Sequence, residues 1–260
     1  MKKIGLALVL LFGVMFASCG EAVVVKTDWE NYNLKGRVKQ IKEFVRNMPD
    51  AERFTMEDSA EGEKYDITRV YKFNEEGYLT EVFSTNQNST TLQKCLYDKD
   101  GVLMMIEMYQ NDKLMRTLVH RYSAMGRLVS VSSVLAEGEK IEVSTFFEYD
   151  EKGNVIKEIN KDAGGNKINE LLYTYDSKGR KTSHRSALPD GYSDDMETLY
   201  RYNDNGDMSQ IETKDNFLKE STYQDFCYYD CDENGNWIRR ETIFMQGRLQ
   251  EVKREYEYYE

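Results

Sequence analysis

Glycine recurs at a nearly constant interval along most of this chain, and that interval restricts the fold more than any other feature of the sequence. Neighbouring members of the series are 24, 25, 27, 26, 27 and 29 residues apart. Self-similarity at such a period is typical of repeat architectures, in which each unit is one supersecondary element packed against the next. The series consists of Gly77, Gly101, Gly126, Gly153, Gly179, Gly206 and Gly235.

The residues around these glycines repeat as well. An aromatic residue stands four positions before six of the seven glycines, with Cys231 as the exception, and Asp, Asn or Ser follows it in every unit. Asp and Asn side chains accept hydrogen bonds from the backbone two residues on, and glycine adopts a positive φ without steric cost. Each unit, such as Tyr149 to Gly153, is therefore predicted to be a hairpin with a type I turn and a G1 bulge.

Further turn-forming residues lie about midway between the glycines, for example Asn111-Asp112 and Gly164-Gly165. The chain is therefore expected to form an all-β antiparallel array of about seven hairpin repeats, either an extended twisted meander or an open solenoid-like sheet. Strands near Val38 and at 256–259 are expected to cap its two ends. The pattern leaves open whether the sheet closes or pairs with a second copy.

Two segments, 47–63 and 187–196, break this rhythm, and they contain both prolines of the chain. Proline removes a backbone donor and is disfavoured inside sheets. Both prolines are thus kept out of the strands, and the acidic first segment is predicted to be a surface loop or a short helix.

The first residues form a processing signal: a cationic start at Lys2 and Lys3 precedes an apolar run that ends at Phe16. The sequence Phe16-Ala17-Ser18-Cys19-Gly20 resembles the lipobox of bacterial lipoproteins. That resemblance implies a lipid on Cys19. The residue after the cysteine is Gly20 and not Asp, which resembles lipoproteins sent to the outer membrane. The leaflet of that membrane stays open. We divide the chain into a signal peptide at 1–18, an anchor and tether at 19–35, and one repeat domain at 36–260.

The net charge restricts the possible partners, and the cysteine spacing restricts the possible disulfides. Removal of Lys2 and Lys3 leaves 33 basic against 46 acidic residues, a formal charge near −13, which disfavours nucleic acid as a partner. Cys227 and Cys231 are four positions apart, roughly 13 Å along a strand, which is beyond the reach of a disulfide. We expect Cys95, Cys227 and Cys231 to be buried free thiols, and we expect no cofactor.

The best repeat units resemble a known family. Tyr173-Thr174-Tyr175-Asp176-Ser177-Lys178-Gly179-Arg180 and Phe147-Glu148-Tyr149-Asp150-Glu151-Lys152-Gly153-Asn154 are similar to the tyrosine-aspartate repeats of the RHS family, and the likeness extends over about 65–260. The spacing here is longer than in typical RHS repeats. The nearer resemblance is to small RHS-repeat-like lipoproteins of Bacteroidetes. RHS arrays form β-sheet shells around cargo, but seven repeats are too few to enclose cargo in that way.

The regular aromatic residues allow two interpretations. The segment from Phe73 to Leu79 also resembles the aromatic-glycine repeats of choline- and glycan-binding modules, whose ligands stack on exposed rings. Alternatively, the tyrosines fill the packed face of the sheet and place their hydroxyls at its rim.

One segment matches a metal-binding pattern. Residues 230–241 satisfy the twelve-residue calcium-loop pattern. The same segment is in register with six sibling turns that lack the pattern, which favours an ordinary hairpin turn and no metal. The ligands of the calcium alternative would be Asp230, Asp232, Asn234, Asn236 and Glu241.

Candidate catalytic residues are few. His120 and His184 are the only histidines, and neither has a neighbouring Cys or acid at the spacing of a metal site or a triad. We expect His120 to be a packed strand residue and His184 to be solvated. Acidic pairs such as Asp194-Asp195 and Glu75-Glu76 lie in turns, where charge is expected for solubility.

These observations favour a non-catalytic cell-envelope lipoprotein that is tethered through Cys19 and presents a β-repeat surface to an envelope protein or a glycan. Two alternatives stay open. One is an envelope glycan hydrolase that uses clustered carboxylates, and the other is a calcium-stabilised adhesion module.

Overall fold

The computed structural model describes residues 27–48, 65–138, 140–187, 196–245 and 247–260. Within these residues one short helix precedes sixteen antiparallel strands, each hydrogen-bonded to the next along the chain. The elements are α1 (Asp28–Asn31), β1 (Val38–Met48), β2 (Ile67–Phe73), β3 (Leu79–Asn86), β4 (Thr90–Tyr97), β5 (Leu103–Gln110), β6 (Lys113–Tyr122), β7 (Leu128–Leu135), β8 (Ile141–Tyr149), β9 (Val155–Asp162), β10 (Lys167–Tyr175), β11 (Lys181–Ala187), β12 (Met196–Tyr202), β13 (Met208–Asp215), β14 (Glu220–Cys231), β15 (Trp237–Phe244) and β16 (Leu249–Tyr258).

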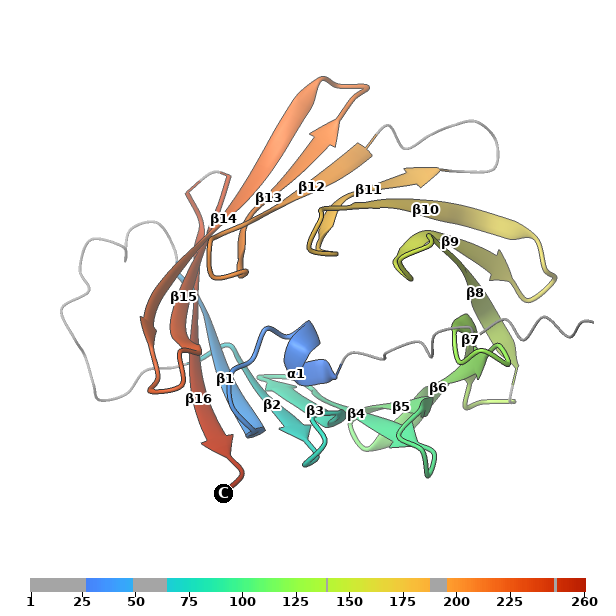
Figure 1. The fold of residues 1–260 in the computed structure, drawn as a ribbon, viewed down its shortest axis with the longest axis horizontal. Helices are drawn as coiled ribbons and strands as arrows, with labels where there is room; N and C mark the ends of the chain where they lie inside the picture. The colour runs from blue at the N-terminus through green and yellow to red at the C-terminus, as the bar shows by residue number, and fades with distance from the viewer. Residues whose placement is uncertain (1–26, 49–64, 139, 188–195, 246) are drawn as a thin grey trace, which may run out of the picture.

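The sheet closes into a barrel, so the prediction of an extended meander or an open solenoid-like sheet was wrong (Figure 1). Strand β1 pairs with β2 on one side and with β16 on the other, and Val45 lies opposite both Ile67 and Val252. The two end strands, which we expected to be caps, therefore satisfy each other's backbone groups. Hairpin signals specify only neighbouring pairs, whereas closure depends on the twist and coiling accumulated over all of the strands.

The predicted turn chemistry is confirmed. All seven repeat glycines have a positive φ, between 75° and 89°. In the unit around Gly153, the backbone N–H of Gly153 donates to the carbonyl of Asp150 at 3.1 Å, and the Asp150 carboxylate accepts from the N–H of Asn154 at 2.8 Å. The intervening turns form at Asn111-Asp112, where both residues have a positive φ. The segments 49–64 and 188–195, which include most of the two stretches that break the repeat, lie outside the described residues.

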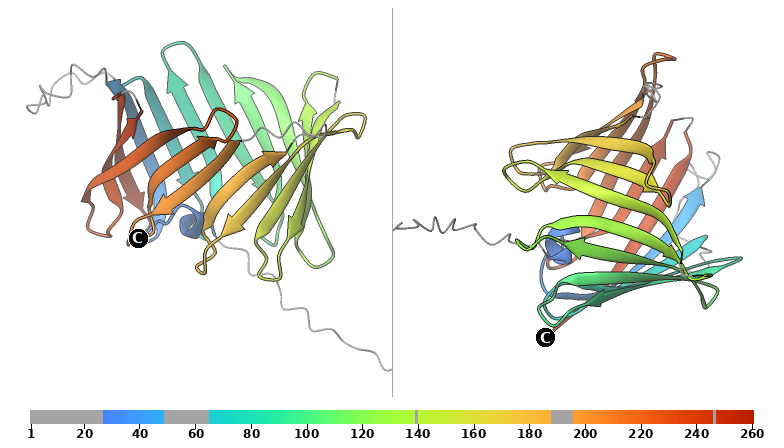
Figure 2. Two further views of the ribbon diagram at one scale, coloured as in Figure 1. Left: turned by 90° about the horizontal axis from the view of Figure 1, so that it is seen from above. Right: turned by 90° about the vertical axis from the view of Figure 1, so that its right-hand side faces the viewer.

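Because the strands alternate in direction, the turns of the seven repeat glycines lie at one end of the barrel, here called the glycine rim, and the intervening turns lie at the other, the far rim (Figure 2). Helix α1 lies inside the barrel at the glycine rim. The Trp29 backbone N–H donates to the carbonyl of Gly77 at 3.2 Å, and its indole N–H donates to the carbonyl of Val38 at 2.7 Å. Residues of the expected tether thus pack against the barrel.

The main core of the barrel surrounds this helix. Val38, Ile41, Phe73 and Leu79 are buried there, and Trp29 packs against them. Most other wall residues are half-buried or exposed, and part of the inner wall borders a cavity. No helix in the described ranges is long and apolar enough to cross a membrane.

Ion pairs cross the seam where the barrel closes. The buried carboxylate of Glu43 on β1 contacts the guanidinium of Arg254 on β16 at 3.0 Å and that of Arg69 on β2 at 2.9 Å. Two cations on neighbouring strands therefore compensate one buried acid. This network lies on the inner face of the sheet and helps to fix the register between β16 and β1.

Candidate functional site

The cross-strand register assigns every strand residue to the inner or the outer wall. Residues directly opposite each other in a sheet point to the same side. Tyr71 faces α1, because its ring lies 6.0 Å from the ring of Tyr32, so Tyr71 and its partners Ile41 and Val82 belong to the inner wall. Following the pairs once around the barrel returns to the same face at Ile41, so the assignment is self-consistent.

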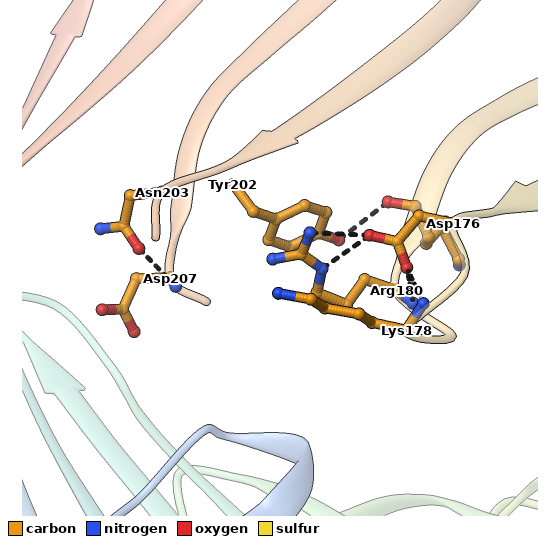
Figure 3. Close-up of polar contacts among 7 residues, drawn as sticks. Asp176, Lys178, Arg180, Tyr202, Asn203 and Asp207 are labelled. Atoms are coloured by element: carbon orange, nitrogen blue, oxygen red, sulfur yellow. Dashed lines mark hydrogen bonds and ion pairs between the residues drawn. The ribbon is translucent and has the colours of Figure 1, made fainter. Parts of the chain in front are cut away.

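A ring of tyrosines lines the inner wall at the glycine rim. Each donates its hydroxyl to the backbone carbonyl of the residue two positions after the preceding repeat glycine, at 2.6–2.8 Å. Figure 3 shows one such contact, from Tyr202. Burial raises the pKa of each of these phenols, so each hydroxyl remains a donor. This tyrosine ladder consists of Tyr97, Tyr122, Tyr149, Tyr175, Tyr202, Tyr228 and Tyr256.

The ladder explains the one exception in the aromatic series. Cys231 occupies the aromatic position of its unit, but Asp230 just before it has a φ of 50°, and Tyr228 donates to the carbonyl of Met208 instead. The Asp and Asn side chains of the repeats, in contrast to the tyrosines, bond within their own turns. Asp176, for example, accepts from the backbone N–H groups of Lys178 and Arg180 (Figure 3). The regular tyrosines therefore join neighbouring repeats through their hydroxyls.

Charged side chains are distributed over the outer wall of the barrel. Of the sixteen described strands, fifteen carry a charged residue on the outer face, and several form exposed cross-strand pairs, such as Lys72 with Glu81 at 2.8 Å. Lys94 lies over the outward ring of Tyr109, 5.5 Å from its centre. By register the fifteen strands contribute Lys42, Lys72, Glu81, Lys94, Glu107, Arg121, Glu148, Lys157, Glu170, Arg185, Glu197, Glu212, Asp225, Glu241 and Lys253.

A cavity of about 890 Å³ opens on the inner wall between β3 and β10. By register, eleven of the residues that line it point inward. They lie mainly toward the far rim, away from α1. The inward-facing lining residues are Val82, Thr91, Gln93, Met108, Gln110, Arg116, Leu118, Ser133, Val143, Asn160 and Asn169.

Hydrogen bonds order one side of this cavity. The Asn160 carbonyl oxygen Oδ1 accepts from the Thr145 hydroxyl at 2.7 Å, and its amide Nδ2 donates to Asn169 Oδ1 at 2.7 Å. On the other side, the guanidinium of Arg116 pairs with the carboxylate of Glu142 at 3.1 Å. The site therefore combines oriented carboxamides, one neutralised ion pair and apolar side chains, a composition suited to binding.

His184 faces the interior, so the prediction of a solvated residue was wrong. Its ring stacks on that of Tyr200 at 5.8 Å between centroids, and its Nδ1 is 2.7 Å from the Tyr200 hydroxyl. Burial lowers the pKa of His184, and the nearby Lys181 lowers it further. No sequence pattern marks this cluster, because the inward positions of β11 carry the polar residues Lys181, His184 and Ser186 and show no apolar alternation.

His120 is buried on the inner wall of β6, which confirms it as a packed strand residue. Burial also lowers its pKa. The three cysteines are free, as expected, but only Cys95 is buried, and Cys231 is exposed. The expectation of burial was therefore wrong for Cys231, and Cys227 is only half-buried.

The oxygens of the calcium-loop segment serve the turn and its contacts with the tether. Asp232 accepts from the backbone N–H of Asn234 and of Asn236, and the Asn236 amide accepts from the N–H of Lys35 at 2.8 Å. Glu241 lies on the outer face of β15, where it accepts from the Tyr229 hydroxyl at 3.0 Å. The fold thus separates the twelfth position of the pattern from the rest.

Among the described residues, no cluster of three His, Cys, Asp or Glu side chains is arranged to hold a metal. Glu75 in its turn pairs with Arg37 at 3.4 Å and lies apart from the cavity. Cys19, Asp194 and Asp195 lie outside the described residues.

No family model and no curated protein matches this chain. Similar solved structures include a porin-like protein from Bacteroides uniformis ATCC 8492, with a TM-score of 0.41, 10% identity, and coverage of 86% of this chain and 99% of that one. A porin-like protein from Bacteroides vulgatus ATCC 8482 has a TM-score of 0.41, 11% identity, and coverage of 85% and 98%. The Photorhabdus luminescens Tc holotoxin pore, with a TM-score of 0.32 and 12% identity, is matched over 78% of this chain and 14% of that one.

Proposed function

We propose that this protein is a non-catalytic binding protein of the cell envelope, tethered through Cys19, which takes up a ligand on the inner wall of its barrel. The observation that carries the proposal is the cavity of about 890 Å³ between β3 and β10. Ligand sites in proteins are concave, of roughly this size, and combine apolar walls with a few oriented polar groups. The binding face is therefore the inner wall of the barrel.

The outer wall supports the same division of roles. A barrel that spans a bilayer presents an apolar band to lipid, and a Lys or Arg at the midplane costs about 2–4 kcal/mol. Outward charges such as Lys94, Lys157 and Arg185 lie along the strands of this barrel. We therefore propose that the barrel stands in water and that only the lipid on Cys19 enters the membrane. The RHS-like lipoproteins that its repeats resemble fit the same location.

The arrangement of carboxylates favours binding over hydrolysis. A glycosidase of the common type needs two carboxyl groups facing each other across the bond that is cleaved, roughly 5–10 Å apart. Within the residues that line the cavity, Glu142 is the only carboxylate, and it is paired with Arg116.

The test uses the full-length Cys19→Ala protein and insoluble polysaccharide and peptidoglycan fractions of a bacterial envelope. Sedimentation with at least one fraction is expected. Leu118→Trp should fill the cavity and abolish retention, whereas Thr117→Trp, on the outer face of the same strand, should leave retention unchanged. Loss of retention in Thr117→Trp alone would place binding on the outer wall and overturn the proposal.

A further inference from the structure

The polar groups of the cavity point to the chemistry of its ligand. Four carboxamide side chains line it, from β4, β5, β9 and β10: Gln93, Gln110, Asn160 and Asn169. A carboxamide offers donors and an acceptor together, as a hydroxyl does. A wall with several such groups is therefore suited to a ligand rich in hydroxyls.

The side-chain amide of Asn169 is oriented to donate a hydrogen bond to a ligand. Asn160 receives a hydrogen bond from Thr145 through Oδ1, which fixes its Nδ2 as the donor to Asn169 Oδ1. That contact occupies the oxygen of Asn169. Among the hydrogen bonds of the described residues, the Nδ2 group of Asn169 takes part in none, so it remains a donor at the cavity wall.

The charges of the cavity disfavour a strongly ionic ligand. Arg116 and Glu142 are the charged residues that line it, and they neutralise each other at 3.1 Å. A charged ligand would need an unpaired counter-charge in a partly desolvated site. The strongly negative chain also repels polyanions at long range.

Apolar side chains complete the wall. Met108, Leu118 and Val143 lie on β5, β6 and β8, among the amides, and point inward. A pyranose ring presents C–H faces as well as hydroxyls, so it can cover apolar side chains and reach the carboxamides at its edge. A purely apolar ligand would instead leave the Asn169 Nδ2 donor without a partner, at a cost in free energy.

We infer that the cavity between β3 and β10 binds an uncharged oligosaccharide, with Asn169 as a hydrogen-bond donor to a sugar oxygen and Leu118 beneath a ring face. This inference rests on the proposed function, because it names the ligand class of that same inner-wall site. Tyr109 and Leu92 also line the cavity but lie on outward register positions, so they are not assigned contacts.

The test is isothermal titration calorimetry of the full-length Cys19→Ala protein with two sets of probes. The uncharged set contains cello-, xylo-, manno- and chito-oligosaccharides, and the charged set contains oligogalacturonates of similar length. At least one uncharged oligosaccharide should bind. Asn169→Ala should weaken that binding by about tenfold, the effect of losing one hydrogen bond to a ligand. The control Glu170→Gln, at the next position on the outer wall, should leave it unchanged.

Asn169 also accepts a hydrogen bond from Asn160, so Leu118→Trp serves as a second variant and should abolish binding. Equal affinities in the wild type and both inner variants would overturn the inference. Binding of oligogalacturonates alone, lost in Leu118→Trp, would overturn the uncharged class while the inner-wall function stands. If no oligosaccharide binds, the inference fails, and retention of envelope fractions then decides the proposed function separately.

Discussion

At the scale of single residues, the tyrosine ladder converts a sequence repeat into a tertiary contact. Each ring belongs to one hairpin, and its hydroxyl donates to a carbonyl of the hairpin before it, as in Tyr149 to Leu128 at 2.6 Å. The aromatic residue is thus required by the neighbouring repeat as well as by its own strand. This explains why the position is filled by tyrosine more often than by phenylalanine.

Removal of one ladder hydroxyl tests this role. Tyr149→Phe should lower the free energy of unfolding by about 1 kcal/mol, because a half-buried carbonyl loses its partner. The control is Tyr109→Phe, whose hydroxyl binds Glu107 on the outer wall at 2.7 Å, and it should have a smaller effect. Urea denaturation gives both values. Equal effects of the two changes would show that the ladder bonds add nothing to stability beyond an exposed hydrogen bond.

The buried histidines predict a pH dependence with a definite sign. Burial lowers the pKa of His120 below the ordinary value of 6.5. Below pH 6.5 the unfolded chain therefore binds a proton at this residue that the folded protein does not. The free energy of unfolding decreases as the pH is lowered from 6.5 to the pKa of His120 in the folded protein. His120→Phe, which introduces the residue found at Phe147 in the same position of a sibling repeat, should flatten this slope. Denaturant midpoints measured between pH 7 and pH 5 would show it, and an unchanged slope would mean that His120 titrates alike in both states.

At the scale of elements, the packing of helix α1 requires a glycine at position 77. The other repeat glycines serve their turns, but Gly77 also leaves room for the helix. A Cβ atom on Gly77 would lie 2.6 Å from the indole of Trp29, whereas a Cβ atom on Gly153 would meet nothing within 4 Å. The two glycines have nearly the same φ, 89° and 87°. They therefore separate backbone strain from contact with the helix.

Replacement of each by alanine isolates that contact. Gly153→Ala should cost about 1 kcal/mol through its positive φ alone. Gly77→Ala should cost about 2–3 kcal/mol, because the indole must also move. Tryptophan fluorescence should change in Gly77→Ala and stay unchanged in Gly153→Ala. If both variants lose the same stability and keep the same fluorescence, α1 does not pack on Gly77 in solution.

At the scale of the whole molecule, local patterns predicted the strands and turns but not the closed shape or the cavity. The Asp150 to Gly153 unit carries all the information for its own hairpin. The pairing of Val38–Met48 with Leu249–Tyr258 joins two ends more than two hundred positions apart, and no residue in either end marks it. The cavity was missed for the same reason: Gln93, Arg116 and Asn169 occupy ordinary alternating positions and come together only when the sheet curves.

The outer wall gives the last prediction, because its charge decides where the barrel can reside. Seven of the outward charges named above are basic, and if each lay near a bilayer midplane at a cost of about 2–4 kcal/mol, the total of about 14–28 kcal/mol would equal or exceed the usual 5–15 kcal/mol of folding stability. The Cys19→Ala protein should therefore remain monomeric in water without detergent and should produce no conductance in planar bilayers, whereas a general porin tested alongside should produce stepwise currents. Aggregation that detergent reverses, together with stepwise conductance, would show instead that the barrel spans a bilayer with residues such as Lys94 and Lys157 facing lipid, and would overturn the proposal that it stands in water.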